Sequence, residues 1–128
     1  MTNAVHDIGV ARQIGAYSDS VEIPRNARWL LTAGTPGLAL DGSAPAAFLE
    51  QAELAWSHIV TMLARVGMTV HDLVKVTQYL VRPGDIAAYA PVRLRFLCGA
   101  RPASMLLVVP ALVRPDLLLE IEAVAARA

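Results

Sequence analysis

The stretch DLVKVTQYLV, residues 72–81, decides the fold because it predicts a strand in the middle of the chain. It is rich in valine and also holds threonine and tyrosine, residue types that favour strands. Successive side chains of a strand point to opposite faces of the sheet. One face is therefore expected to carry Val74, Val76, Gln78 and Leu80, and the other Lys75, Thr77 and Tyr79.

A helical pattern precedes this strand. Apolar residues recur there at steps of three and four, which is typical of one face of an amphipathic helix. They are Phe48, Ala52, Ala55, Ile59, Met62 and Val66. Asp41 or Ser43 is expected to cap the N-terminus, Pro45 to lie in the first turn and Gly67 to end the helix.

A second helical pattern follows the strand, after the turn RPGD at residues 82–85. Asp85 is expected to cap this helix, which should run through Cys98. Pro91 lacks a backbone N–H and crowds the preceding turn of a helix. The sequence therefore predicts either a kink at Pro91 or a helix that begins properly only near Ala90.

Strand patterns also lie toward both ends of the chain. Residues 18–34 predict two short strands around a turn at residues 24–26, and residues 104–109 and 117–126 predict the last two strands. The order is ββαβαββ, an α+β fold with one mixed sheet whose crossover helices both cover one face. The chain offers no third long helix for the other face, so we expect other subunits to bury it.

Composition limits the classes of function. A length of 128 residues predicts one domain, residues 1–128. The apolar share of 55% suggests more hydrophobic surface than one core needs, as in an oligomer. Basic and acidic residues number 11 each, which argues against a nucleic-acid partner held by bulk charge. Neither a bilayer-spanning run nor a signal-peptide pattern is seen, so we expect a cytoplasmic protein with no membrane partner.

Residues that bind metals are sparse. His6, His58 and His71 are widely spaced, so no metal site is expected; we interpret His58 as helix surface and His71 as a loop residue. The single cysteine, Cys98, excludes an intrachain disulfide and is interpreted as a buried structural thiol. No cofactor is expected.

Six short stretches, in this order, resemble the RidA/YjgF family of reactive-intermediate deaminases from Tyr17 to Ala125. They are GAYSDSV, WLLTAGTPG, QAELAWSHIVTMLARVGM, DLVKVTQYLV, RPASM and LLLEIEAVA. The resemblance implies a chorismate-mutase-like fold and a homotrimer with ligand clefts at the three subunit interfaces. It also implies hydrolysis of enamines and imines derived from amino acids, which releases ammonia and a 2-oxo acid.

The chain departs from the family pattern at positions that matter for ligand binding. The family's penultimate strand opens with Pro-Ala-Arg-Ser, whose arginine grips the substrate carboxylate as a planar fork. Here Ser104 stands at the place of that arginine, Ala90 replaces an asparagine, and Thr35 replaces a glutamine. Tyr17, Gly34 and Glu120 are kept. The chain therefore resembles a branch of the family that lacks the arginine.

The resemblance implies a cleft in which Glu120 and Tyr17 are the candidate catalytic residues. The alternatives are a solvent-facing strand residue, or one paired with a Lys or Arg, for Glu120 and a packing role for Tyr17. The candidate ligand-binding residues are Ala33, Gly34, Thr35, Arg93, Ser104 and Met105. Arg93 could supply the missing positive charge, and Met105 would make the cleft more apolar; their alternatives are a solvated helix face and ordinary packing.

Two hypotheses of function follow. In the first, the protein processes a small molecule and hydrolyses an imine or enamine that needs no free carboxylate. In the second, it is a non-catalytic trimer that binds a metabolite or another partner. Ribonuclease activity, which has been described for some relatives, is disfavoured by the balanced charge and by the absence of an aromatic stacking platform.

Overall fold

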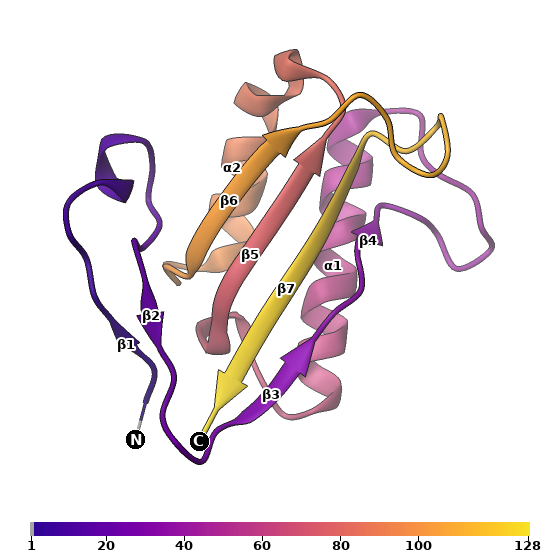
Figure 1. Cartoon of the computed structure of the whole chain (residues 1–128). Coiled ribbons are helices and arrows are strands. Elements are labelled where there is room, and N and C mark those ends of the chain that lie inside the picture. Colours follow the sequence, from indigo (N-terminus) through magenta and orange to yellow (C-terminus); the bar gives the residue numbers. More distant parts are fainter. Residues whose placement is uncertain (1) are drawn as a thin grey trace.

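The computed structural model describes residues 2–128 and contains one five-stranded mixed sheet with two helices. The main strands run in the order β3 (Arg28–Leu31), β7 (Leu119–Arg127), β5 (Leu73–Leu80) and β6 (Ala103–Val108), and the short β4 (Thr35–Pro36) pairs with the start of β7. Strands β5 and β6 are parallel, and the other pairings are antiparallel. This arrangement confirms the predicted α+β class (Figure 1).

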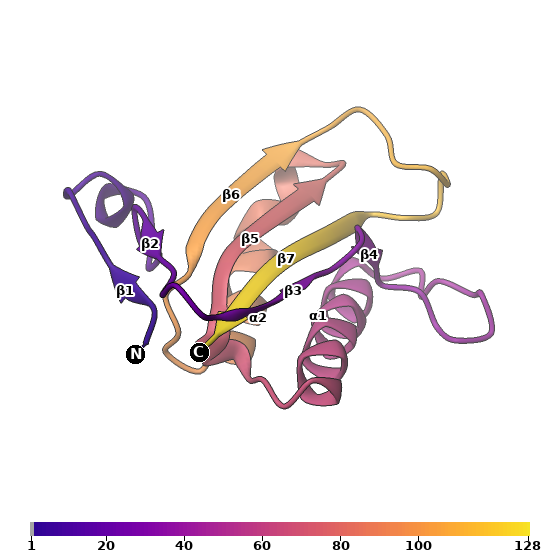
Figure 2. The ribbon, with the colours of Figure 1, turned by 60° about the horizontal axis from the view of Figure 1, so that its bottom comes forward.

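Both helices cover the same face of the sheet. Helix α1 (Phe48–Arg65) and helix α2 (Ile86–Leu97) lie behind the sheet in Figure 1 and on one side of it in Figure 2. We call this side the helix face and the opposite side the open face, which carries no helix formed by residues 2–128. The open face is where the sequence predicts a need for cover.

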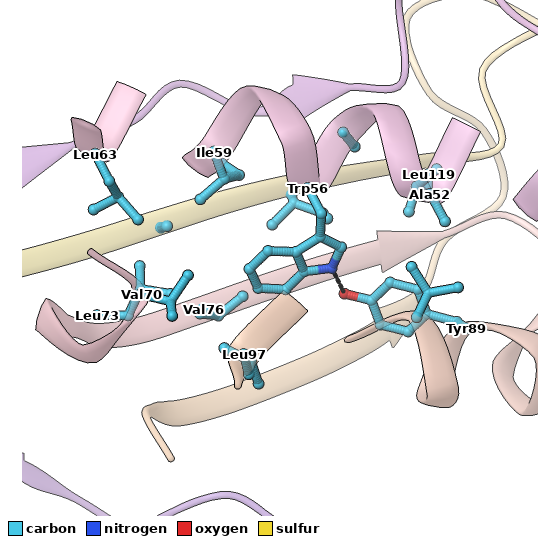
Figure 3. Packing of buried hydrophobic residues seen from close by; sticks show 14 of the residues in the cluster. Ala52, Trp56, Ile59, Leu63, Val70, Leu73, Val76, Tyr89, Leu97 and Leu119 are labelled. Carbon is cyan, nitrogen blue, oxygen red and sulfur yellow. Dashed lines mark hydrogen bonds between the residues drawn. The ribbon is translucent and has the colours of Figure 1, made fainter. Parts of the chain in front are cut away.

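The core lies between the two helices and the sheet (Figure 3). Helix α1 contributes Trp56 and Ile59, and α2 contributes Tyr89. Strand β5 alternates as predicted: Val76, Gln78 and Leu80 are buried on the helix face, whereas Lys75, Thr77 and Tyr79 are half-buried on the open face. Strand β7 alternates in the same way, with Leu119, Ile121, Ala123 and Ala125 buried.

The N-terminal segment forms a separate small ribbon. Strand β2 (Val21–Glu22) pairs with β1 (Ala4–Val5), and a short 3-10 turn (Ala11–Gln13) lies between them. The two early strands that the sequence predicts therefore exist as β2 and β3, but each pairs with a different partner. The ribbon meets the main sheet where Ser18 bridges Ala103 at the start of β6.

The N-terminal caps expected for both helices are wrong. Helix α1 begins at Phe48 with Ala47 at its N-cap position, so Asp41, Ser43 and Pro45 all precede the helix. Asp41 instead accepts hydrogen bonds from the backbone and hydroxyl of Ser43 inside the preceding loop. Helix α2 begins at Ile86, and the carboxylate of Asp85 is engaged by Arg82 at 2.7 Å instead of capping the helix.

One of the two alternatives for Pro91 and the expectation for Cys98 are also wrong. The helix does not begin near Ala90: Pro91 lies inside it, on an exposed side where water can solvate the carbonyl that loses its partner. Cys98 is exposed rather than buried. It is the C-cap residue of the helix and adopts the left-handed conformation with a φ of 49°.

Candidate functional site

Glu120 lies near the start of β7 with its side chain on the open face. It pairs with Tyr79 of β5 on one side and with Pro36 of β4 on the other. Gly34, just before β4, lies against the carboxylate: a Cβ atom there would come within 3.1 Å of the Glu120 Cδ. The missing side chain of Gly34 therefore makes room for the carboxylate.

Ala33 and Thr35 complete this region. Both flank Gly34, and the Thr35 hydroxyl donates to the Ala33 carbonyl at 3.0 Å, which closes the turn into β4. The structure thus brings together four of the candidate residues. We call Ala33, Gly34, Thr35 and Glu120 the Glu120 cluster.

Tyr17 lies at the opposite edge of the sheet, beside β6. The backbone N–H of Ser18 donates to the Pro102 carbonyl at 3.2 Å, and the Arg101 side chain donates to the Tyr17 carbonyl at 3.3 Å. Asp19 orders the preceding loop by accepting three backbone N–H groups, led by that of Ile8, which lower the pKa of its carboxyl group. These contacts place Tyr17 at the entrance of β6.

Arg93 extends from α2 toward the same place. Its guanidinium stacks over the Tyr89 ring at 5.7 Å from the centroid. A Cβ atom at Gly15 would lie 3.9 Å from the Arg93 Nη2 and 3.4 Å from the Tyr17 ring, so both side chains approach this glycine. Among residues 2–128, no carboxylate lies within 4.0 Å of the Arg93 guanidinium.

Ser104 lies on the helix face of β6. It pairs with Val76, whose side chain is buried against the helices, and its hydroxyl accepts a hydrogen bond from the Gln78 side-chain amide at 3.0 Å. Met105 is the next residue, so its side chain points to the open face, where it is 49% exposed. Ser104 and Met105 therefore do not line the same surface of one chain.

The candidate residues fall into two groups within a single chain. The first group lies around the start of β6 and the second half of α2. It consists of Tyr17, Arg93 and Ser104, and we call it the serine group. Strand β5 separates β6 from β7, which carries Glu120 (Figure 1). Ser104 and Glu120 also point to opposite faces of the sheet. One chain therefore does not form a cleft that contains both groups.

Sequence reasoning missed a buried polar chain that supports Ser104. The Tyr89 hydroxyl donates to the Gln78 Oε1. The same hydroxyl accepts from the indole N–H of Trp56, the bond drawn in Figure 3. Burial raises the pKa of the Tyr89 hydroxyl, so it stays protonated. The signal that could have revealed this chain is Gln78, the one polar side chain on an otherwise apolar strand face.

The open face exposes large apolar side chains. Trp29 is 58% exposed and Leu31 is 67% exposed, both on β3, in addition to Met105 on β6. Single exposed apolar residues are ordinary, whereas several on one uncovered sheet face are typical of surfaces that bind another molecule.

One cavity lies apart from both groups. It has a volume of about 480 Å³ and opens between α1 and α2, where its lining is almost wholly apolar. Residues 2–128 hold no group of three or more His, Cys, Asp or Glu side chains that could bind a metal ion. In the same range, no helix is both long and apolar enough to cross a membrane.

Comparison with known proteins gives consistent matches over nearly the whole chain. The family described as Endoribonuclease L-PSP matches residues 9–127. The Rid-family protein YyfB of Yersinia pestis, of unknown function, superimposes with a TM-score of 0.86 at 28% identity, covering 99% of this chain and all of that one.

Two Escherichia coli structures are also similar. TdcF, solved with bound serine, has a TM-score of 0.73 at 27% identity, covering 90% of this chain and 91% of its own. The YjgF gene product has a TM-score of 0.73 at 26% identity, with the same coverage of both chains.

Proposed function

Because this chain belongs to the endoribonuclease L-PSP family, together with the Rid and YjgF proteins, we propose that it processes a small molecule in clefts between the subunits of a homotrimer. The observation that carries the proposal is the separation of the serine group from the Glu120 cluster within one chain. A cleft that contains both groups needs two chains.

A closed ring of identical subunits satisfies this need. In a ring, each interface joins two different surfaces of neighbouring copies. The edge with the serine group of one subunit would meet the edge with the Glu120 cluster of the next, which makes three equivalent clefts in a trimer. The exposed Trp29 and Leu31 support burial of the open face in the same assembly.

Glu120 is the proton-transfer group of the proposed reaction. Its carboxylate accepts a proton from a water molecule as the water oxygen attacks the carbon of a C=N bond, and it returns the proton to the nitrogen. The carbon–nitrogen bond of the resulting carbinolamine then breaks: its hydroxyl proton passes through Glu120 to the departing nitrogen, a C=O bond forms and ammonia leaves. Water and an imine thus give a carbonyl compound and ammonia, with no change in oxidation state. Tyr17 lines the opposite wall of the cleft.

Ser104 sets the class of substrate. A serine hydroxyl cannot form the charge-assisted two-donor contact that an arginine makes with a carboxylate. Losing that contact removes about 1.5–3 kcal/mol of carboxylate recognition, or roughly a tenfold to hundredfold loss of affinity. The proposed substrate is therefore an imine or enamine without a free carboxylate.

Ammonia release from imines generated in solution tests the catalytic proposal. We expect the protein to accelerate hydrolysis of imines that lack a carboxylate, and to act weakly on the 2-imino acids derived from alanine and leucine. No acceleration over buffer across both sets would contradict the catalytic proposal.

The second candidate is a trimer that binds a ligand without turnover. It is favoured by the hydrogen bond that the Ser104 hydroxyl accepts from Gln78, which gives this side chain a structural role whether or not chemistry occurs. A ligand that binds only the folded state raises the melting temperature with its concentration. A neutral metabolite that stabilises the protein and is recovered unchanged would favour this second function.

A further inference from the structure

The buried polar chain behind Ser104 has a fixed direction, which begins at Trp56. An indole N–H can only donate, and Trp56 Nε1 lies 3.2 Å from the Tyr89 hydroxyl oxygen (Figure 3). Tyr89 therefore accepts from Trp56. Its single proton goes to the Gln78 Oε1 at 2.8 Å.

At the other end of this row of hydrogen bonds, the contacts of Gln78 impose the same direction. Gln78 Nε2 lies 2.8 Å from the Met105 carbonyl oxygen and 3.3 Å from the Val76 carbonyl oxygen. Carbonyl oxygens only accept, so the nitrogen of the amide must face them. Two independent constraints thus fix the orientation of the Gln78 amide, and its N–H donates to the Ser104 hydroxyl oxygen at 3.0 Å.

The hydroxyl proton of Ser104 is left without an acceptor. Among residues 2–128, the only hydrogen bond of the Ser104 side chain is the one that its hydroxyl oxygen accepts from Gln78. Ser104 is half-buried at the start of β6, in the serine group, where the family resemblance places ligand recognition. A hydroxyl that is held as an acceptor on one side has its donor free for the other side.

We propose that Ser104 donates this proton to an uncharged carbonyl oxygen of the ligand, and that Gln78 and Tyr89 are positioning residues that enforce this polarity. The inference rests on the function proposed above and specifies its substrate. A carboxylate would lose its hydration and gain a single hydrogen bond from an uncharged donor, which does not compensate its desolvation. A ligand with an N–H or ammonium group at this point would meet a second donor.

Three related probes distinguish these ligand classes. N,N-dimethylpyruvamide presents an uncharged carbonyl next to an acetyl group, pyruvate presents a carboxylate there, and dimethylaminoacetone presents an ammonium group. Their dissociation constants are measured with the full-length protein by ligand-observed NMR. We expect the amide to bind more tightly than either charged probe.

Variants at Ser104 test its role as a donor. Ser104→Ala should weaken binding of the amide about 2- to 10-fold, the value of one neutral hydrogen bond, and leave pyruvate unchanged. Ser104→Thr keeps the hydroxyl and is the matched control, which should bind like the wild type. Equal affinity of the Ala and Thr variants for the amide would overturn the inference.

Gln78→Met tests the positioning role, because it removes the N–H while Ser104 remains. The Ser104 hydroxyl can then turn toward the vacated Met105 carbonyl, so we expect the same loss of amide binding as in Ser104→Ala. The double variant should lose no more than either single variant. If Gln78→Met does not fold, the Ser104 pair, at a half-buried edge-strand position, still decides the question.

Two other outcomes would overturn the inference. One is tighter binding of pyruvate than of the amide, with that preference lost in Arg93→Met, because Arg93 would then be the recognition group. The other is no binding of the amide by the wild type. Each would leave the proposed function standing if the protein still releases ammonia from imines, so the two failures are distinguishable.

Discussion

Replacing Gln51 by leucine is expected to lower the free energy of unfolding by about 3 kcal/mol or more. Gln51 is fully buried on α1, and its Nε2 donates to the carbonyls of Pro45 and Asp116, each at 2.8 Å. Its Oε1 accepts from the Leu118 backbone N–H, also at 2.8 Å. Leucine would remove the hydrogen-bond partner of two carbonyls and one N–H in partly buried loops, at about 1–3 kcal/mol for each group that water cannot reach.

Urea denaturation followed by tryptophan fluorescence measures this effect, at one fixed protein concentration because the stability of the proposed trimer would depend on concentration. Gln13→Leu is the matched control: it makes the same chemical change on an exposed residue and should shift stability by less than about 0.5 kcal/mol. If both variants shift stability equally, Gln51 does not hold the two loops to α1.

Replacing Glu120 by glutamine is expected to reduce ammonia release from imines at least about 100-fold, because glutamine keeps the shape of the side chain but cannot take a proton from water. The fold should be unaffected, since Glu120 is only half-buried on the open face. Initial rates with a carboxylate-free imine provide the measurement, and the melting temperature checks that the variant is folded.

Glu122→Gln is the matched control for this experiment. Glu122 lies two residues along the same face of β7, where it accepts a hydrogen bond from the Tyr79 hydroxyl at 3.4 Å. Its carboxylate raises the pKa of that hydroxyl, as does Glu120 more weakly. Equal rates for Glu122→Gln and Glu120→Gln would show that Glu120 has no specific role in proton transfer.

Local patterns in the sequence predicted much of the fold. The alternation along residues 73–80 and the apolar steps of residues 48–65 follow directly from the periods of strands and helices, and both elements are where they are expected. Pairing partners depend on contacts between distant segments. The sequence of β2 therefore predicts a strand, but not that it pairs with β1 instead of β3.

Errors occurred where side chains had a choice of partners. Asp41 and Asp85 are suitable caps by residue type, but each found a closer partner in Ser43 or Arg82. Cys98 is apolar enough for a core, yet the left-handed turn that ends α2 places it outside. Such competition is decided by the local geometry of the loop, which cannot be read from the types of residue in it.

The candidate residues could be selected from the sequence, but their arrangement could not. Strand parity alone indicates that Ser104 and Met105 point to opposite faces. The separation of Ser104 from Glu120 depends on β5 lying between their strands, and the hydrogen bond from Gln78 depends on the parallel register of β5 and β6. That arrangement is the basis for the claim that two chains build one site.

Native mass spectrometry of the purified protein tests this claim most directly. The account predicts a trimer of about 41 kDa, three times the 13.7 kDa mass of one chain. Leu31→Asp, which adds a charge to the exposed open face, should shift the population toward smaller species. A wild-type protein that remains a 13.7 kDa monomer at working concentrations would contradict the account, because the Glu120 cluster and the serine group would then never share a cleft.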